Sequence, residues 1–92
     1  MTAEFDDEHE VDHTLRSVLV DVLGLSTAQV DGFDEASPLF GSLPEFDSMA
    51  VAGLLTELEE RLAILIEDHE VGADMLETYG ALLAFARAKA LQ

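Results

Sequence analysis

The first apolar stripe of the chain lies between residues 15 and 23. Its five large apolar side chains recur at intervals of one, three and four residues, as they do on one face of an α-helix. They are Leu15, Val18, Leu19, Val22 and Leu23. Gly24 follows directly, where a helix commonly ends with a left-handed residue. We therefore expect a helix that begins near Asp12 or Thr14 and ends at about Leu23.

Three further helices are predicted downstream. Asp47 is expected to cap a helix that runs to about Leu62, because apolar residues repeat at helical spacing between these two positions. Thr78 is expected to cap a last helix whose apolar face continues to Ala86. Residues 72 to 77 can form a short third helix between these two long helices.

A long connection separates the first two long helices, over residues 26 to 44. It carries four turn signals, Asp31-Gly32, Ser37-Pro38, Gly41-Ser42 and Leu43-Pro44. Loops of more than about 12 to 15 residues are uncommon and are usually functional or disordered, and apolar residues such as Val30 and Leu39 favour a loop pinned to the core. The sequence thus predicts an all-α fold, an antiparallel four-helix bundle with three long helices, one short third helix and a long loop between helices 1 and 2.

Charge narrows the range of partners. Twenty acidic residues against four basic ones give a net charge of −16, which repels nucleic acids and anionic membranes and favours basic protein partners. The chain has no cysteine, so any thiol chemistry must come from an added group. It shows neither a signal peptide nor an apolar run approaching the roughly 20 residues of a membrane span. We expect a soluble, cytoplasmic monomer.

Residues 1 to 12 are rich in acids and poor in large apolar residues, which predicts a flexible acidic lead before a single domain over residues 13 to 92. The lead overlaps the string His9-Glu10-Val11-Asp12-His13, which matches the zinc-protease signature H-E-x-x-H. In a helix the two histidines would share a face, with Glu10 as general base. The string lacks an apolar helical setting, and its only candidates for a third ligand are His69 or a carboxylate, neither of them assured. We therefore predict no functional metal site and at most adventitious binding. A metal-dependent hydrolase is the remote alternative.

Ser48 stands at the start of the helix predicted from Asp47. Serine and aspartate ahead of an apolar run are ordinary helix-start residues. At this position, however, unpaired backbone N–H groups and the positive end of the helix dipole would favour a bound anion such as a phosphodiester. No histidine is near in the sequence and no Gly-x-Ser-x-Gly elbow surrounds the serine. Ser48 is therefore better suited to be modified than to act as a nucleophilic catalyst.

In a small acidic chain, the Asp47-Ser48-Met49 triplet resembles the Asp-Ser-Leu attachment site of acyl carrier proteins, and with helix spacing included the resemblance extends from about Leu15 to Leu91. It implies a covalent 4′-phosphopantetheine on Ser48, added by a phosphopantetheinyl transferase, with Asp47 and Met49 beside it. The arm would hold acyl groups as thioesters, so the chain would be a carrier and not an enzyme. Its partners would be acyl-activating, acyl-transferring or condensing enzymes with basic docking patches.

Two further sets of residues follow from this resemblance. An acyl chain gains from shelter between helices, and the residues expected to line such a pocket are Leu54, Ile64 and Met75, with Met49. Acids of related carriers meet arginines and lysines of partner enzymes, and the acids expected to do so here are Glu57, Glu59 and Glu60. Ordinary core packing and solubility are the competing interpretations of these two sets.

The chain also departs from the family pattern. Ala50 and Gly53 stand where fatty-acid carriers often have acids, and Leu-Pro-Glu-Phe precedes Asp47 in place of the common Gly-Leu. This favours a specialised carrier, resembling those beside bacterial polysaccharide or secondary-metabolite enzymes. Ala63 replaces a glycine at the end of the second long helix, where a left-handed residue would cost about 1–2 kcal/mol, so we expect another exit from that helix. An acidic helical interaction module without a prosthetic group is the alternative function.

Overall fold

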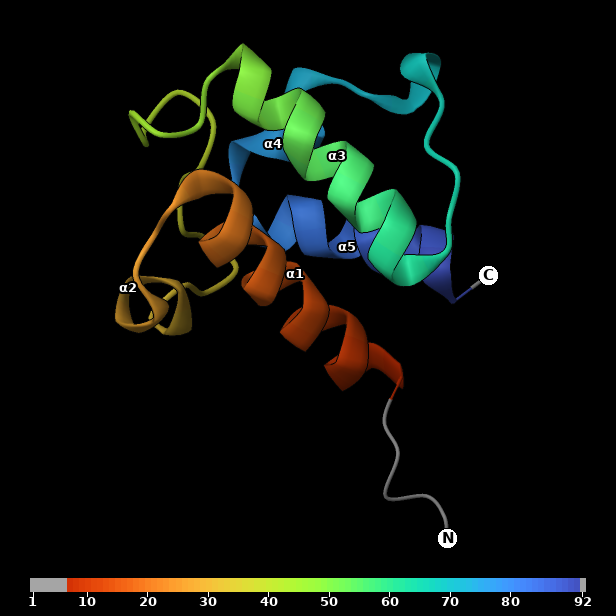
Figure 1. The fold of residues 1–92 in the computed structure, drawn as a ribbon, viewed down its shortest axis with the longest axis horizontal. Coiled ribbons are helices and arrows are strands. Elements are labelled where there is room, and N and C mark those ends of the chain that lie inside the picture. The colour runs from red at the N-terminus through yellow and green to blue at the C-terminus, as the bar shows by residue number, and fades with distance from the viewer. Residues whose placement is uncertain (1–6, 92) are drawn as a thin grey trace, which may run out of the picture.

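The computed structural model of the chain describes residues 7–91, without the side chains of Asp7 and Glu8. These residues form five α-helices and one short 3₁₀ helix (Figure 1). The elements are α1 Asp7–Leu23, α2 Thr27–Asp31, α3 Ser48–Leu62, the 3₁₀ helix Asp68–Glu70, α4 Ala73–Glu77 and α5 Tyr79–Ala90. The described residues contain no strand, and the predicted all-α fold is confirmed.

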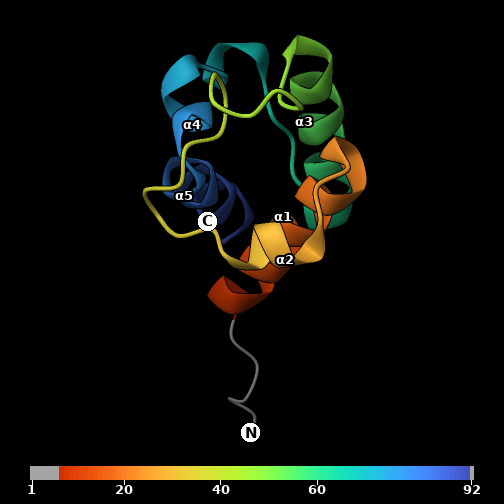
Figure 2. The ribbon, with the colours of Figure 1, turned by 90° about the vertical axis from the view of Figure 1, so that its left-hand side faces the viewer.

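Helix α1 packs against α2, α3 and α5, and α4 packs against α5. Helices α3 and α5 both run in the direction opposite to α1 (Figure 1). Figure 2 shows α4 and α5 on one side of the molecule and α3 on the other. The space between the helices is filled by apolar side chains, and the largest fully buried ones include Leu15, Leu19, Leu54, Leu58, Tyr79 and Leu82. None of the described polar or charged residues is buried.

Helix α1 begins earlier than predicted, at Asp7 instead of near Asp12 or Thr14. Val11 is buried four residues before Leu15, so the apolar face of the helix extends one turn further toward the N-terminus. Residues 7 to 12 of the predicted lead therefore belong to α1, and the flexibility expected of the lead stays a prediction. Residues 1 to 6 lie outside the described residues.

The predicted caps of the two later long helices are confirmed. The Ala50 N–H donates to Oδ1 of Asp47 at 2.8 Å, and the Ala81 N–H donates to Oγ1 of Thr78 at 3.1 Å. Each cap satisfies one of the backbone donors that a helix start leaves unpaired. Helix α4 lies where the short helix was predicted.

Helix α2 interrupts the predicted long loop. Its cap is Ser26, whose hydroxyl accepts the N–H of Gln29 at 3.1 Å. A serine followed three residues later by glutamine is a sequence signature of a helix start. Val30 on this helix is buried, so α2 attaches the beginning of the connection to the core.

The rest of the connection runs along the junction of α4 and α5. The Leu39 N–H donates to the carbonyl of Glu77 at 2.9 Å, and the Gly80 N–H donates to the carbonyl of Glu35 at 3.0 Å. A Cβ atom on Gly80 would lie 2.8 Å from that same Glu35 oxygen, so this close approach requires glycine. The connection thereby lies against α4 and α5 before it turns toward α3 (Figure 2).

Arg16 of α1 fixes the connection from the other side. Its Nη1 donates to the Val30 carbonyl at 2.6 Å and its Nη2 to the Phe33 carbonyl at 3.2 Å. Its Nε pairs with the carboxylate of Asp12 at 3.1 Å, and its guanidinium carbon lies 4.6 Å from the ring centroid of Tyr79. A single side chain therefore joins α1, α2, the connection and α5.

The end of α3 contradicts the expectation of another helix exit. Ala63 itself adopts the left-handed conformation, with φ 56° and ψ 47°. The N–H groups of Ala63 and Ile64 both donate to the carbonyl of Glu59. These hydrogen bonds satisfy a carbonyl of the last helical turn and offset the strain of a left-handed alanine.

The Ala63→Gly variant should be more stable than the unaltered protein. Glycine removes a left-handed strain of about 1–2 kcal/mol. It also makes the unfolded chain more flexible, which lowers stability by about 0.4–1 kcal/mol. The free energy of unfolding should therefore rise by about 0.5–1 kcal/mol. Urea unfolding followed by circular dichroism measures this change. Ala84→Gly, on the exposed side of α5, is the control and should destabilise by about 1 kcal/mol. Equal destabilisation by both glycines would contradict the left-handed helix end.

The Asp12 carboxylate should make stability depend on acid pH. Burial acts to raise its pKa, but hydrogen bonds from Tyr79 and Arg16 and the charges of Arg16 and Arg87 outweigh this and lower the pKa. Stability from the ionised form is therefore present above the unfolded pKa of about 3.9 and is lost as pH falls through the folded value. The urea midpoint should depend less on pH between about pH 5 and pH 2 in Asp12→Asn than in the unaltered protein. The exposed control Asp31→Asn should keep the dependence of the unaltered protein. An unchanged slope in Asp12→Asn would contradict this role.

Candidate functional site

Ser48 is the first residue of α3, and its side chain is exposed. Asp47 accepts the N–H groups of the next turn, that of Ala50 through its carboxylate and that of Val51 through its carbonyl. The N–H groups of Ser48 and Met49 donate to no acceptor in the described part of the chain. An exposed hydroxyl therefore stands beside unpaired donors at the positive end of a 15-residue helix, an environment that favours a bound anion.

Met49 follows Ser48 and leaves 85% of its surface exposed. On the side of the connection, Ser48 borders a hollow of about 480 Å³, lined by Phe40, Gly41, Ser42, Leu43, Pro44, Phe46, Asp47 and Ser48. Phe46 is buried and meets Phe40 edge to face at 5.8 Å between ring centroids. The buried ring anchors the chain immediately before Asp47 and so fixes the start of α3.

A second hollow, of about 510 Å³, runs from Ser48 along α3, and we call it the α3 groove. It is lined by Ser48, Val51, Ala52, Leu55, Thr56, Glu59, Ile66, Asp68 and Val71. The residues from α3 are three or four positions apart and so lie on one face of the helix. The other three come from residues 63–72, the segment that joins α3 to α4. The groove therefore begins at the exposed hydroxyl and has walls of mixed polar and apolar character.

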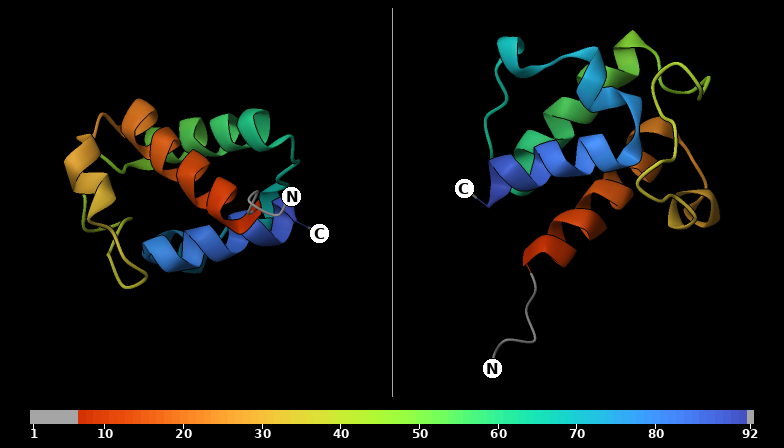
Figure 3. Two further views of the ribbon diagram at one scale, coloured as in Figure 1. Left: turned by 90° about the horizontal axis from the view of Figure 1, so that it is seen from below. Right: turned by 180° about the vertical axis from the view of Figure 1, so that it is seen from behind.

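The segment 63–72 can be followed from the end of α3 to the start of α4 in the right-hand view of Figure 3. Near its start, the Ile66 N–H donates to Oε2 of Glu59 at 2.7 Å. Further along, Glu70 pairs with Nζ of Lys89 at 2.9 Å and accepts the Glu67 N–H at 3.0 Å. The Glu67 amide and the Lys89 ammonium lower the pKa of Glu70. Two carboxylates thus hold the segment that forms one wall of the groove.

The three residues predicted to line an acyl pocket occupy other positions. Leu54 and Met75 belong to the buried core, and Ile64 is half-buried. None of them lines the α3 groove, and their role toward an acyl chain stays a prediction. The apolar residues that do line it are Val51, Leu55, Ile66 and Val71. Spacing identifies Val51 and Leu55, because they lie three and seven residues after Ser48 on the same face of the helix.

The three predicted docking acids differ in what they contact. Glu57 pairs with Nε of Arg61 at 2.9 Å, and Arg61 also pairs with Asp21 of α1 at 2.8 Å. Glu59 holds the Ile66 N–H, whereas Glu60 is exposed. Glu60 is therefore the most available of the three to a partner, and changing Glu59 would also disturb the groove.

The string His9-Glu10-Val11-Asp12-His13 lies within α1, where its two histidines share one helical face. Residues 7–91 contain no group of three or more side chains placed to hold a metal ion. The prediction that the string has no functional metal site stays a prediction.

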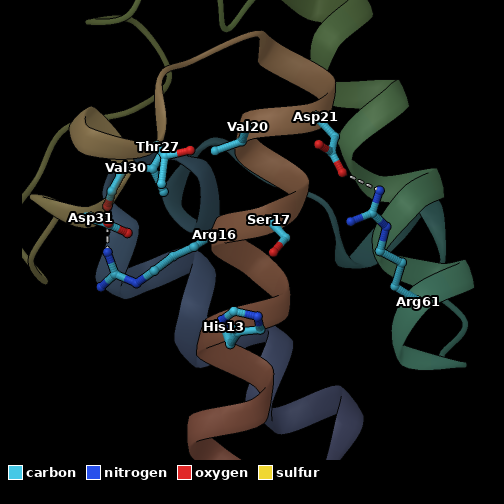
Figure 4. A pocket seen from close by; sticks show the side chains of 9 residues that line it. All are labelled: His13, Arg16, Ser17, Val20, Asp21, Thr27, Val30, Asp31 and Arg61. Carbon is cyan, nitrogen blue, oxygen red and sulfur yellow. Dashed lines mark hydrogen bonds and ion pairs between the residues drawn. The ribbon is translucent and has the colours of Figure 1, made fainter.

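A third hollow, of about 330 Å³, lies between α1, α2 and the end of α3 (Figure 4). It has two arginines in its lining, Arg16 and Arg61. Figure 4 shows Arg16 directed at the Val30 carbonyl and Arg61 at Asp21. Both guanidiniums are occupied by groups of the chain itself, so the α3 groove is the better candidate for a ligand.

None of the helices in residues 7–91 is both long and apolar enough to cross a membrane.

Comparison of the sequence with protein-family models and with curated proteins gives no match. Among solved structures, the fold is similar to the solution NMR structure of a holo acyl carrier protein from Nitrosomonas europaea, with a TM-score of 0.78. The two sequences are 35% identical, and the match covers 89% of this chain and 96% of that one. The likeness thus extends to sequence over nearly the full length of both chains. The chain belongs to the acyl carrier protein family, as its sequence predicted, and is a carrier and not an enzyme.

Proposed function

We propose that the chain carries acyl groups as thioesters on a 4′-phosphopantetheine arm attached to Ser48. The observation that carries this proposal is the position of Ser48, an exposed hydroxyl at the start of α3 beside unpaired backbone donors and the mouth of the α3 groove. The holo state of the Nitrosomonas europaea protein supports it.

The residues around Ser48 fit such an arm. The N–H groups of Ser48 and Met49 suit a phosphodiester. Val51, Leu55 and Ile66 offer apolar contacts along the groove, and the Thr56 hydroxyl offers a hydrogen-bond partner for amide groups. When bound, the arm supplies the thiol that this cysteine-free chain lacks.

In the attachment reaction Ser48 supplies the hydroxyl that is modified, and the transferase supplies the catalytic groups. Oγ of Ser48 forms the new bond to phosphorus, the pyrophosphate bond of coenzyme A breaks, and adenosine 3′,5′-bisphosphate leaves. The serine proton passes to a base of the transferase. The Asp47 carboxylate accepts the Ala50 N–H through Oδ1, so Asp47 places Ser48 by capping the helix.

The partners we propose are the transferase and enzymes that activate, transfer or condense acyl groups, with basic docking patches. Glu60 is exposed and Glu57 half-buried on α3, and the net charge of −16 favours association with basic surfaces. We also propose a specialised pathway, because Ala50 stands where fatty-acid carriers often have an acid. Gly53 also stands at such a position, and packing does not require it to be glycine, since a Cβ there would lie 3.4 Å from Cγ1 of Val22.

Ser48→Ala should abolish attachment of the arm and leave the fold intact. Incubated with coenzyme A, magnesium and a broad-specificity phosphopantetheinyl transferase, the unaltered protein should gain the mass of one phosphopantetheinyl group, and Ser48→Ala should gain none. Because Asp47 and not Ser48 caps α3, the free energy of unfolding should change by less than about 0.5 kcal/mol. Intact-mass spectrometry and urea unfolding measure the two effects.

The matched control is Ser42→Ala, an exposed serine six residues earlier in the chain. This variant should be modified like the unaltered protein. If several transferases leave the folded, unaltered protein unmodified, the proposal fails and the acidic interaction module without a prosthetic group takes its place.

A further inference from the structure

Glu59 is the last residue of α3 that lines the α3 groove. Its Oε2 accepts the Ile66 N–H at 2.7 Å, which joins α3 to the opposite wall of the groove. Its Oε1 accepts no hydrogen bond from any group in the described chain. The α3 wall of the groove therefore ends in a half-buried carboxylate with one oxygen unused.

The length of the groove matches the length of the proposed arm. Glu59 follows Ser48 by eleven residues, which at a rise of about 1.5 Å per residue places it roughly 16 Å along the helix. The arm has about fourteen bonds from serine oxygen to sulfur, and at the reach of an extended peptide, about 1.1–1.2 Å per bond, it also spans roughly 16 Å. An arm lying in the groove brings the acyl group to Glu59.

The charge of the lining restricts what can lie there. Two carboxylates, those of Glu59 and Asp68, line the groove, and no cationic side chain does. An apolar acyl end would take water from the Glu59 carboxylate without replacing its hydrogen bonds, which costs free energy. A second carboxylate at the acyl end would be repelled, whereas an ammonium group would form a charge-assisted hydrogen bond.

We propose that Glu59 is a specificity-determining residue and that the α3 groove selects short acyl groups with a cationic, hydrogen-bond-donating end, such as aminoacyl groups. The inference rests on the proposed attachment of the arm to Ser48. It adds the chemical class of the cargo to that proposal.

The test compares three acyl forms of the protein, loaded from their coenzyme A thioesters by a broad-specificity transferase and verified by mass. β-Alanyl and butyryl groups have nearly the same shape and differ in an ammonium or methyl end, and malonyl has a carboxylate end. The melting temperature of the β-alanyl form should exceed that of the butyryl form by about 2–4 °C, with the malonyl form lowest. Exchange of the Ile66 amide hydrogen should be slowest in the β-alanyl form.

Glu59→Gln removes the charge but keeps an oxygen that can accept the Ile66 N–H. In this variant the difference between the β-alanyl and butyryl forms should disappear. Glu77→Gln, at the exposed end of α4, makes the same change in net charge away from the groove and should keep the difference. The pair separates a local contact from general relief of the negative charge of the chain.

A butyryl form as stable as the β-alanyl form in the unaltered protein would overturn the proposal, as would an equal difference in Glu59→Gln and Glu77→Gln. Should Glu59→Gln fail to fold, amide exchange in the unaltered protein decides, and equal protection of Ile66 in both forms overturns the proposal. Loading of Ser48 is verified by mass in each case. Failure of this inference is thus distinguishable from failure of the carrier proposal.

Discussion

The rest of the structure depends on the hydrogen bonds by which Arg16 fixes the long connection between α1 and α3. The 24 residues between α1 and α3 contain only one short helix, and they must nevertheless deliver Asp47 and Ser48 to a fixed place. The Arg16 guanidinium donates hydrogen bonds to the carbonyls of Val30 and Phe33 and to the Asp12 carboxylate. A lysine could not reproduce this planar arrangement of donors. With the connection fixed there, along α4 and α5, and by the buried ring of Phe46, α3 starts at a defined position and its exposed serine is presented to partners.

The few basic side chains form ion pairs that hold the fold together. The basic residues Arg16, Arg61 and Lys89 each pair with acids of the chain. Two of these pairs join separate parts of the fold, since Arg61 ties α3 to Asp21 of α1 and Lys89 ties α5 to Glu70 of the segment 63–72. Ion pairs near the surface contribute little individually, but the pair of Lys89 and Glu70 holds the segment that forms one wall of the groove. The remaining acids leave the surface strongly negative, which supports the proposal of basic partners.

The positions of the long helices could be predicted from residues close together in the sequence, whereas the groove depends on contacts between different elements. Apolar spacing and the caps Asp47 and Thr78 predict α3 and α5, because helix signals lie within a few residues of one another. The early start of α1 was signalled by Val11 four residues before Leu15, and α2 by Ser26 and Gln29, but the acidic and turn-rich surroundings obscured both. The acyl-lining prediction named the core residues Leu54 and Met75. The groove follows instead from the path of residues 63–72, which the left-handed Ala63 and the bond between Glu59 and the Ile66 N–H determine. The family's glycine position at residue 63 signalled the helix end, but no pattern in the sequence signalled the bond between Glu59 and Ile66.

The central claim, that cargo attached at Ser48 is held along one face of α3, is tested most directly by comparing amide NMR spectra of the protein before and after phosphopantetheinylation. If the arm lies in the groove, shifts should follow its lining, at Ser48, Val51, Leu55, Glu59 and Ile66, with α1 and α2 unchanged. Shifts confined to Ser48 and its immediate neighbours, or spread instead over Phe40 to Phe46, would contradict it.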